Sequence, residues 1–367
     1  MIGIESTSRS NFERYMPKTK QLLEDNTLFL RLDGFNKIGM NSDPNISPIL
    51  NGIDPEFLYN YHHDCYPSSE HYMDDCPFIW KNFSEKGYVT VFMEDLPHLG
   101  LFHFERTGFL DQPTDYYSSA THKAAYEIIS HTETRLTNCR NCYAYELISD
   151  VNLEHIYNAF ETFHDKVPLF VYSFLASFTH DSDTNLAWVD DSYFKFLTKF
   201  INKGYMDDTI ILFYGDHGYR WGNFRKTHFG RIEENMPLMS LIFPHWFKSE
   251  YPETWRNLKA NQHKLTSNYD IHLTLTDILE GSFKTSQKLT SHSGFGQSLF
   301  LEVPRNRSCE DAGIPLHYCA CEHGEIVAPE REDVKQASYA FMDETAALLA
   351  GVADVCEPLT LSKVSRS

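Results

Sequence analysis

The chain has 367 residues, of which 42% are hydrophobic, and it carries a formal net charge of −19 at pH 7. This length allows one large domain, or one domain with an appendage. Acidic residues are spread along the chain and no basic face is visible, so the composition argues against a nucleic-acid partner. An anionic group can still bind locally, where a metal or a few basic residues overturn the average field.

The pattern of apolar residues predicts strands that alternate with helices along the chain. Short apolar runs indicate strands at Ile2–Glu5, Thr27–Phe35, Val89–Glu94, Leu169–Ser177, Thr209–Tyr214 and Leu238–Phe243. Helical spacing indicates helices at Arg9–Asp25 (one helix or two short ones), Asn45–Leu50, Leu147–Lys166, Asp191–Lys203, Asn268–Leu279 and Val334–Leu349. Strands that are apolar on both faces indicate a mostly parallel sheet with helices on both faces, which is an α/β fold.

The last part of the chain is rich in cysteine and differs from what precedes it. We expect one domain over residues 1–304 and a small cysteine-containing extension over residues 305–367. The chain has eight cysteines, and an even number is typical of a compartment that permits disulfide bonds. Cys139-Arg-Asn-Cys142 leaves a zinc knuckle or a redox pair open as an alternative, although no second CxxC or histidine pair accompanies it.

The amino terminus, Met1-Ile-Gly-Ile4, reads as the second half of a strand, and no signal peptide or membrane span is visible. We therefore expect a targeting or anchoring segment to precede it in a longer gene product. The protein would then be extracellular or in the secretory pathway, either secreted or anchored in the membrane through that segment. Two glycosylation sequons, at Asn82 and Asn306, fit this setting.

Polar side chains follow the predicted strands, at the edge of the sheet where ligands bind in such folds. Glu5 ends the first strand, His180 follows the strand at 169–177, and Asp216-His217 follows the strand at 209–214. Ser42 precedes a short predicted helix, whose first N–H groups favour an anion.

Carboxylates and an imidazole at one edge of a sheet suit Zn²⁺ or Mn²⁺. A serine near such a cation has a lowered pKa and can attack phosphorus or sulfur. Each segment taken alone also has an ordinary structural explanation. Asp and Ser often cap helices, and Gly215-Asp-His-Gly218 has the composition of a turn. The occurrence of all four segments in order at strand ends favours a site.

The same segments resemble the DUF229 family, a sulfatase-like group within the alkaline phosphatase/sulfatase superfamily. The resemblance covers nearly the whole chain. It rests on "IESTSRSNFERYMPKT", "GMNSDPNISPILNG", "YGDHGYRWGNFRKTHFGRIEENMPLMSLIFP", "YDIHLTLTDIL" and "GQSLFLEVPRNRSCEDAGIPLHYCAC".

The resemblance implies a role for each matching residue. Glu5, Asp216 and His217 match metal ligands, and Ser42 matches the nucleophile, which is also a metal ligand. Two further histidines and an asparagine match positions that bind the substrate or shape the nucleophile turn, namely His180, His228 and Asn45. The family pattern implies one divalent metal, Zn or Mn, with a second left open by other histidines such as His272 and His292.

The chain departs from the sulfatase pattern at the nucleophile. Sulfatases carry Cys or Ser followed by x-Pro-x-Arg, and the first residue becomes formylglycine. Here Ser42-Asp-Pro-Asn-Ile46 places Ile46 where that pattern has Arg.

This difference favours direct attack by Ser42 on phosphorus. The expected function is a metal-dependent hydrolase or transferase of phosphate esters that forms a covalent phospho-enzyme. The expected substrate is a small-molecule, lipid or glycan ester. A sulfatase and a catalytically inactive secreted binding protein of the same fold remain as alternatives.

Overall fold

The computed structural model describes residues 1–55, 72–96, 100–104, 106–132, 141–143, 146–282, 293–321, 327–352 and 359–362. Several positions considered above lie outside these residues, namely Cys65, Cys139, His292 and Cys356. The described chain divides into two compact units, Met1–Ala320 and Cys321–Ser367. The first unit carries the sheet and every candidate site residue.

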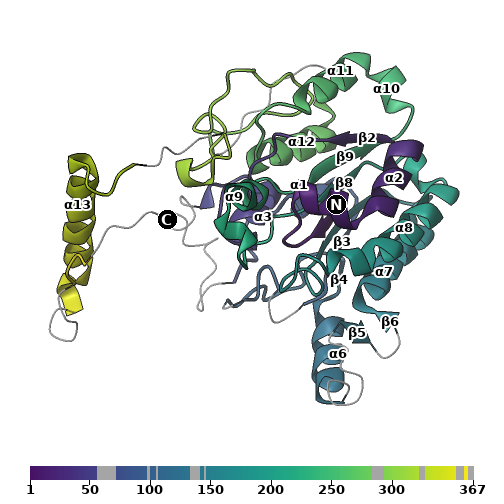
Figure 1. Ribbon diagram of the computed structural model, residues 1–367. Helices are drawn as coiled ribbons and strands as arrows, with labels where there is room; N and C mark the ends of the chain where they lie inside the picture. The colour runs from purple at the N-terminus through teal and green to yellow at the C-terminus, as the bar shows by residue number, and fades with distance from the viewer. Residues whose placement is uncertain are drawn as a thin grey trace. The chain divides into compact units, whose positions relative to one another are not determined.

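The first unit is built on a sheet of seven strands, in the order β2-β9-β8-β1-β7-β3-β4 (Figure 1). The strands are β1 (Ile2–Ile4), β2 (Leu28–Arg31), β3 (Val89–Glu94), β4 (Tyr116–Tyr117), β7 (Leu169–Leu175), β8 (Ile211–Tyr214) and β9 (Met239–Phe243). The strands from β8 to β4 pair in parallel, whereas β9 pairs antiparallel with β8 and with β2. The predicted α/β fold with a mostly parallel sheet is therefore confirmed. The antiparallel strands at one edge of the sheet were not predicted.

One face of the sheet is covered by the helices α1 (Arg9–Tyr15), α2 (Pro17–Asn26), α7 (Ile148–Phe163) and α8 (Leu186–Asn202) (Figure 1). Their apolar side chains form a buried cluster with alternate strand residues such as Ile4, Val171 and Phe213. Because successive side chains of a strand point to opposite faces, the neighbours of these residues enter a separate core.

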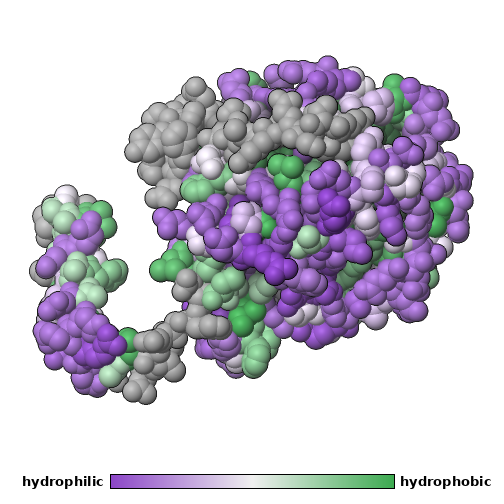
Figure 2. All heavy atoms as spheres, turned by 90° about the horizontal axis from the view of Figure 1, so that it is seen from above, coloured by the Kyte–Doolittle hydropathy of each residue, from purple (hydrophilic) through white to green (hydrophobic). Residues whose placement is uncertain are grey.

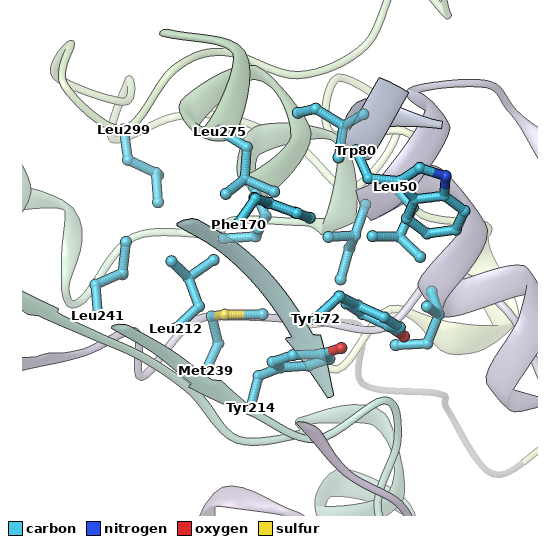
Figure 3. Packing of buried hydrophobic residues seen from close by; sticks show 14 of the residues in the cluster. Leu50, Trp80, Phe170, Tyr172, Leu212, Tyr214, Met239, Leu241, Leu275 and Leu299 are labelled. Atoms are coloured by element: carbon cyan, nitrogen blue, oxygen red, sulfur yellow. The ribbon is translucent and has the colours of Figure 1, made fainter. Parts of the chain in front are cut away.

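The other face packs against α3 (Ser42–Asn51), α5 (Ile79–Glu85), α10 (Phe247–Glu250), α11 (Pro252–Asn261) and α12 (Asn268–Glu280). Figure 3 shows Leu212, Tyr214, Met239 and Leu241 of the strands facing helix residues that include Leu50, Trp80 and Leu275. Two strand cores on opposite faces explain why β7, β8 and β9 are mostly apolar, with Ser173 and Ser240 as buried exceptions. Both faces carry helices, as predicted.

Two helix ends show ordinary capping chemistry. α12 starts with a capping box in which the Ser267 and Asp270 side chains each bond to the other residue's backbone. α3 ends at Gly52, whose φ of 71° lies in the left-handed region that glycine adopts readily. The remaining regular elements are α6 (Ser119–Thr132), α9 (His228–Asn235), η2 (Tyr205–Asp207), η3 (Phe224–Lys226), η5 (Leu316–Tyr318) and the β5 (Cys142–Tyr143) and β6 (Glu146–Leu147) hairpin.

The segment that precedes Ala320 packs on the first unit, and the expected domain division between residues 304 and 305 stays a prediction. Ala312 and Ile314 are buried in a small cluster with Ile38 and Tyr269, and a disulfide joins Cys309 to Cys319. Cys142 is also disulfide-bonded, as is Cys76. The second unit, Cys321–Ser367, contains α13 (Glu332–Leu349) and η6 (Ala350–Val352).

None of the helices in the described parts of the chain has the length and apolar character that crossing a bilayer requires.

Candidate metal and nucleophile site

The structure brings three of the predicted metal ligands together. One ligand atom each from Glu5, Asp216 and His217 lies within 4.8 Å of the others, and all three side chains are buried. Glu5 follows β1 and Asp216-His217 follows β8, the strand beside it. Because β1 and β8 are parallel, their carboxyl ends meet at one edge of the sheet.

The turn after β1 is shaped to hold Asp216. The backbone N–H of Ser6 donates to Asp216 Oδ1 at 2.9 Å. Ser6 has a φ of 54°, the one positive value at a non-glycine residue in the described chain. Such a conformation costs roughly 1 kcal/mol or more and is retained where the surrounding structure enforces it. The strained backbone at Ser6 therefore holds Asp216 Oδ1 in place. The other oxygen, Asp216 Oδ2, is left directed at the cluster.

His217 is held in one tautomer. Its Nδ1 lies 2.9 Å from the carbonyl oxygen of Gly218, which can only accept, so Nδ1 carries the proton. The Nε2 lone pair therefore faces Asp216 Oδ2 at 3.3 Å. Both atoms are buried without a hydrogen-bond partner among the described residues. Two facing acceptors repel each other unless a cation lies between them, so the donor set fits a divalent metal.

Burial sets the charge state of this cluster. It raises the pKa of Glu5 well above its usual range, and the charge of Asp216 raises it further. Burial also lowers the pKa of His217 to about 4, so the imidazole is neutral at pH 7. A bound divalent cation would favour the ionised carboxylates, because it replaces the water that burial removes.

The flanking glycines are required by close backbone approach. A Cβ on Gly215 would lie 2.1 Å from the carbonyl oxygen of Thr7, and one on Gly218 would lie 2.1 Å from that of Glu233. Neither glycine has a positive φ. The motif therefore needs glycine for space on both sides of the metal-binding pair, and conformational freedom is not the reason.

Ser42 is the first residue of α3 and is half-buried, and its hydroxyl lies close enough to the Glu5 carboxylate to lower the pKa of that group, against the larger effect of burial. The preceding Asn41 makes no side-chain cap, because its Oδ1 accepts from Arg220. The first turn of α3 therefore presents backbone N–H groups beside the serine hydroxyl, where an anion is favoured.

His180 also joins the cluster. It follows β7, and its Nε2 lies 3.8 Å from Glu5 Oε1 while Nδ1 contacts Asp181 at 2.7 Å. His228, in contrast, is the exposed first residue of α9 and is not part of the metal-ligand group. Its substrate contact stays a prediction.

Asn45 is held by hydrogen bonds within the turn that precedes Ser42. Its amide is fully buried, its oxygen accepts from the N–H groups of Ile38 and Gly39, and its nitrogen donates to the carbonyls of Gly39 and Asn41. These four bonds use the hydrogen-bonding capacity of an amide. Asn45 therefore shapes the turn before Ser42, and its assignment to substrate binding stays a prediction.

Sequence reasoning missed three charged residues around the cluster. Arg220 bonds to the carbonyl oxygen of Met40 at 3.0 Å and lowers the pKa of Glu5 and of His217 through its charge. Lys37 is fully buried beside Glu234, and its charge also lowers the pKa of His217. Asp95 accepts from the backbone N–H groups of Ala176 and Ser177, which fixes the turn that leads to His180.

His272 lies apart from these residues, where its Nδ1 contacts the carbonyl of Ile49 at 3.0 Å. A cavity of about 690 Å³ lies at the other edge of the sheet, among the first residues of β7 and β8, such as Leu169 and Ile211. It is lined by none of the predicted site residues. The site is therefore identified by the chemistry of its side chains and not by the volume of a cavity.

Comparison with solved structures shows the same fold in other proteins. The C-terminal periplasmic domain of EcEptC from Escherichia coli matches with a TM-score of 0.52 and 12% identity, over 84% of this chain and 86% of that one. The same domain in complex with Zn matches with a TM-score of 0.50 and 11% identity, over 76% and 81%.

Two further matches come from other bacteria. The lipoteichoic acid synthase LtaP from Listeria monocytogenes has a TM-score of 0.50 and 12% identity, over 82% of this chain and 75% of that one. The phosphonate monoester hydrolase SpPMH from Silicibacter pomeroyi has a TM-score of 0.52 and 12% identity, over 84% and 77%. No curated protein sequence matches the chain.

The family comparison covers almost every residue. The model described as "Protein of unknown function (DUF229)" matches residues 1–365. Because this match covers nearly the whole chain, the chain belongs to the DUF229 family.

Proposed function

We propose that the protein is a metal-dependent hydrolase or transferase of phosphate esters, with Ser42 as nucleophile. The observation that carries this proposal is the contact between the Ser42 hydroxyl and Glu5, inside the cluster where Asp216 Oδ2 and His217 Nε2 face each other unpartnered. Glu5, Asp216, His217 and Ser42 would hold a divalent ion, Zn or Mn. When bound, it would lower the pKa of the serine hydroxyl and screen developing charge.

The chain's own residues supply the rest of the chemistry. The Ser42 Oγ–P bond forms as the ester P–O bond breaks, and the alcohol leaves with the electron pair and takes up a proton. The first turn of α3 and Arg220 stabilise the non-bridging oxygens, and His180 contacts them from the β7 side. Water or an acceptor alcohol then breaks the Ser42 Oγ–P bond and releases or transfers the phosphoryl group.

The residue at position 46 supports phosphate over sulfate. Ile46 is fully buried in the core that covers one face of the sheet, together with Ile49 and Leu50. This position therefore provides packing, where the sulfatase pattern has an arginine that serves formylglycine chemistry. The Zn complex of the Escherichia coli domain and the phosphonate monoester hydrolase of Silicibacter pomeroyi are consistent with the proposed metal and reaction.

The disulfides support an oxidising compartment for the protein. Cys309–Cys319 closes a short loop, and Cys76 and Cys142 are each disulfide-bonded. Because such bonds persist outside the cytosol, we assign the protein to the extracellular space or the secretory pathway.

The test combines metal content with ester turnover. Purified protein is supplied with Zn²⁺ or Mn²⁺, the bound metal is measured by plasma mass spectrometry, and aryl phosphate monoesters, diesters and sulfates are assayed. We expect about one equivalent of metal and turnover of a phosphate ester. Asp216→Ala should lose both, whereas Ser42→Ala should lose turnover and retain metal in large part.

Ser42→Thr is the matched control, because it keeps a hydroxyl on the same helix position and should retain measurable turnover. Formylglycine at residue 42, together with sulfate release, would establish a sulfatase instead. Bound metal without turnover of any ester, and no effect of Ser42→Ala on any measured property, would establish the inactive binding protein.

A further inference from the structure

One segment beside the site has a composition opposite to that of the whole chain. Residues 220–231, "RWGNFRKTHFGR", contain four Lys or Arg and no Asp or Glu, in a protein of net charge −19. The same twelve residues hold three large aromatic side chains, Trp221, Phe224 and Phe229. We call residues 220–231 the basic-aromatic segment.

The aromatic side chains of this segment are turned outward. Trp221 is 59% exposed, Phe224 is 49% exposed and Phe229 is 72% exposed. Met40, which contacts Arg220 through its carbonyl oxygen, adds a fourth large apolar side chain at 52% exposure. On the face that Figure 2 shows, hydrophobic groups lie scattered among hydrophilic ones. Large exposed apolar side chains that gather in one place mark binding surfaces.

The segment is an ordered surface. Thr227 caps α9 by accepting from the N–H of Gly230, and a Cβ at Gly230 would lie 2.0 Å from the carbonyl oxygen of Phe224. Arg225 bonds to Glu234 at 2.7 Å, which ties η3 to α9. In the described part of the chain, no acidic side chain pairs with Lys226 or Arg231, so their charges face solvent.

The segment borders the nucleophile turn. Arg220 bonds to Met40 and Asn41, the two residues that precede Ser42, and it follows the metal-binding pair by a few residues in sequence. A molecule that rests on the exposed aromatic residues would therefore present its polar part close to the site entrance.

Exposed Trp and Phe side chains between lysine and arginine are typical of proteins that bind the interface of an anionic membrane. The aromatic rings enter the boundary between headgroups and acyl chains, and each basic residue is attracted to the negative surface. We propose that the basic-aromatic segment docks the protein on an anionic lipid surface, so that the substrate is a phosphate ester at the headgroup level of an amphiphile. The substrate part of this inference rests on the proposed function.

The docking itself is tested without any ester or metal. Wild-type protein is sedimented with phosphatidylcholine vesicles, and with vesicles that also contain phosphatidylglycerol, at low and at high salt. We expect binding to the anionic vesicles that weakens with salt, and little binding to the neutral ones. Lys226→Ala/Arg231→Ala should weaken this binding about 25-fold, because each basic residue near such a surface contributes about fivefold.

Matched controls separate this segment from the rest of the surface. Lys248→Ala/Lys259→Ala removes two exposed lysines from α10 and α11, and should leave vesicle binding unchanged. Trp221→Ser should weaken binding to anionic vesicles, whereas Trp188→Ser, at a tryptophan that is 68% exposed on α8, should not. Circular dichroism confirms that each variant is folded.

Several results would overturn the inference. The wild type could bind both vesicle types equally, or bind neither. The control variants could also lose as much vesicle binding as the variants of the basic-aromatic segment. Self-association of the wild type that Trp221→Ser abolishes would assign the segment to a second copy of the chain. Ser42→Ala should bind vesicles as the wild type does. Docking without any turnover would therefore refute the proposed function alone, and turnover of soluble esters without docking would refute this inference alone.

Discussion

Glu234 should contribute far more to stability than its neighbour Glu233, although both are ion-paired. Glu234 Oε1 lies 2.8 Å from Lys37 Nζ, and the two side chains are 6% and 0% exposed. Glu233 lies 2.6 Å from Arg14, at a place where the arginine side chain is 43% exposed. The two residues are adjacent on α9, so the same substitution can be compared at nearly the same place.

The pKa values of the buried pair show which partner depends on the other. Burial lowers the pKa of Lys37, and the charge of Glu234 only partly opposes this. Burial alone would raise the pKa of Glu234, but Arg225 and Lys37 together hold it below its usual value. The two shifts differ because Glu234 has two cationic partners and Lys37 has one anionic partner. Lys37 is therefore the residue left without compensation when Glu234 is neutralised.

Glu234→Gln should lower the free energy of unfolding by about 3 to 5 kcal/mol, because it leaves a buried ammonium group unpaired. Glu233→Gln should cost about 1 kcal/mol or less, as exposed ion pairs do. Urea unfolding followed by circular dichroism measures both values, provided that the slope against urea is unchanged. Lys37→Met/Glu234→Met should recover most of the loss, since it removes both buried charges.

Equal costs for Glu234→Gln and Glu233→Gln would refute this reasoning. A double variant that is less stable than Glu234→Gln would also contradict it, because the loss would then come from packing and not from an unpaired charge.

Three further predictions concern the site and its surroundings. Zn²⁺ or Mn²⁺ at a hundred times its dissociation constant should stabilise the wild type by about 2.7 kcal/mol in calorimetric unfolding, and His217→Gln should show no such gain. Burial raises the pKa of Glu94 from 4.5 to about 7, so the folded protein retains a proton that the unfolded chain releases. Glu94 should therefore contribute a fall in stability of about 3 kcal/mol as pH rises from 4.5 to 7, and Glu94→Gln should remove this contribution from the difference between urea titrations at pH 5 and 8. Arg220→Gln should retain bound metal and lower kcat/KM for phosphate esters about a hundredfold, the usual effect of removing one donor to a developing anion; unchanged kinetics would remove Arg220 from the site.

The strands and the clustering of the candidate metal ligands could be predicted because both depend on local pattern. β7 and β8 are mostly apolar, and a parallel sheet places the residues that follow them at one edge. Glu5, Asp216 and His217 were found by that rule. The antiparallel pairing of β9 could not be predicted, because apolar strands look alike in sequence whichever way they run.

The charged residues around the cluster could not be predicted, because their contacts connect distant parts of the chain. Arg220 reaches Met40 across 180 positions, and Lys37 meets Glu234 across 197. The contacts of Asn45 could not be predicted for a related reason. Its place in the nucleophile turn was clear from sequence, but its bonds to Ile38 and Gly39 depend on how the turn folds back.

The space requirement at Gly215 and Gly218 limits what this motif can reveal about activity. A relative that had lost the metal would still have to accommodate the carbonyl oxygens of Thr7 and Glu233, and would therefore still need both glycines. Retention of the glycines says only that the turn is folded in the same way. Whether a family member can be a catalyst has to be judged from the two residues between them, together with Glu5 and Ser42.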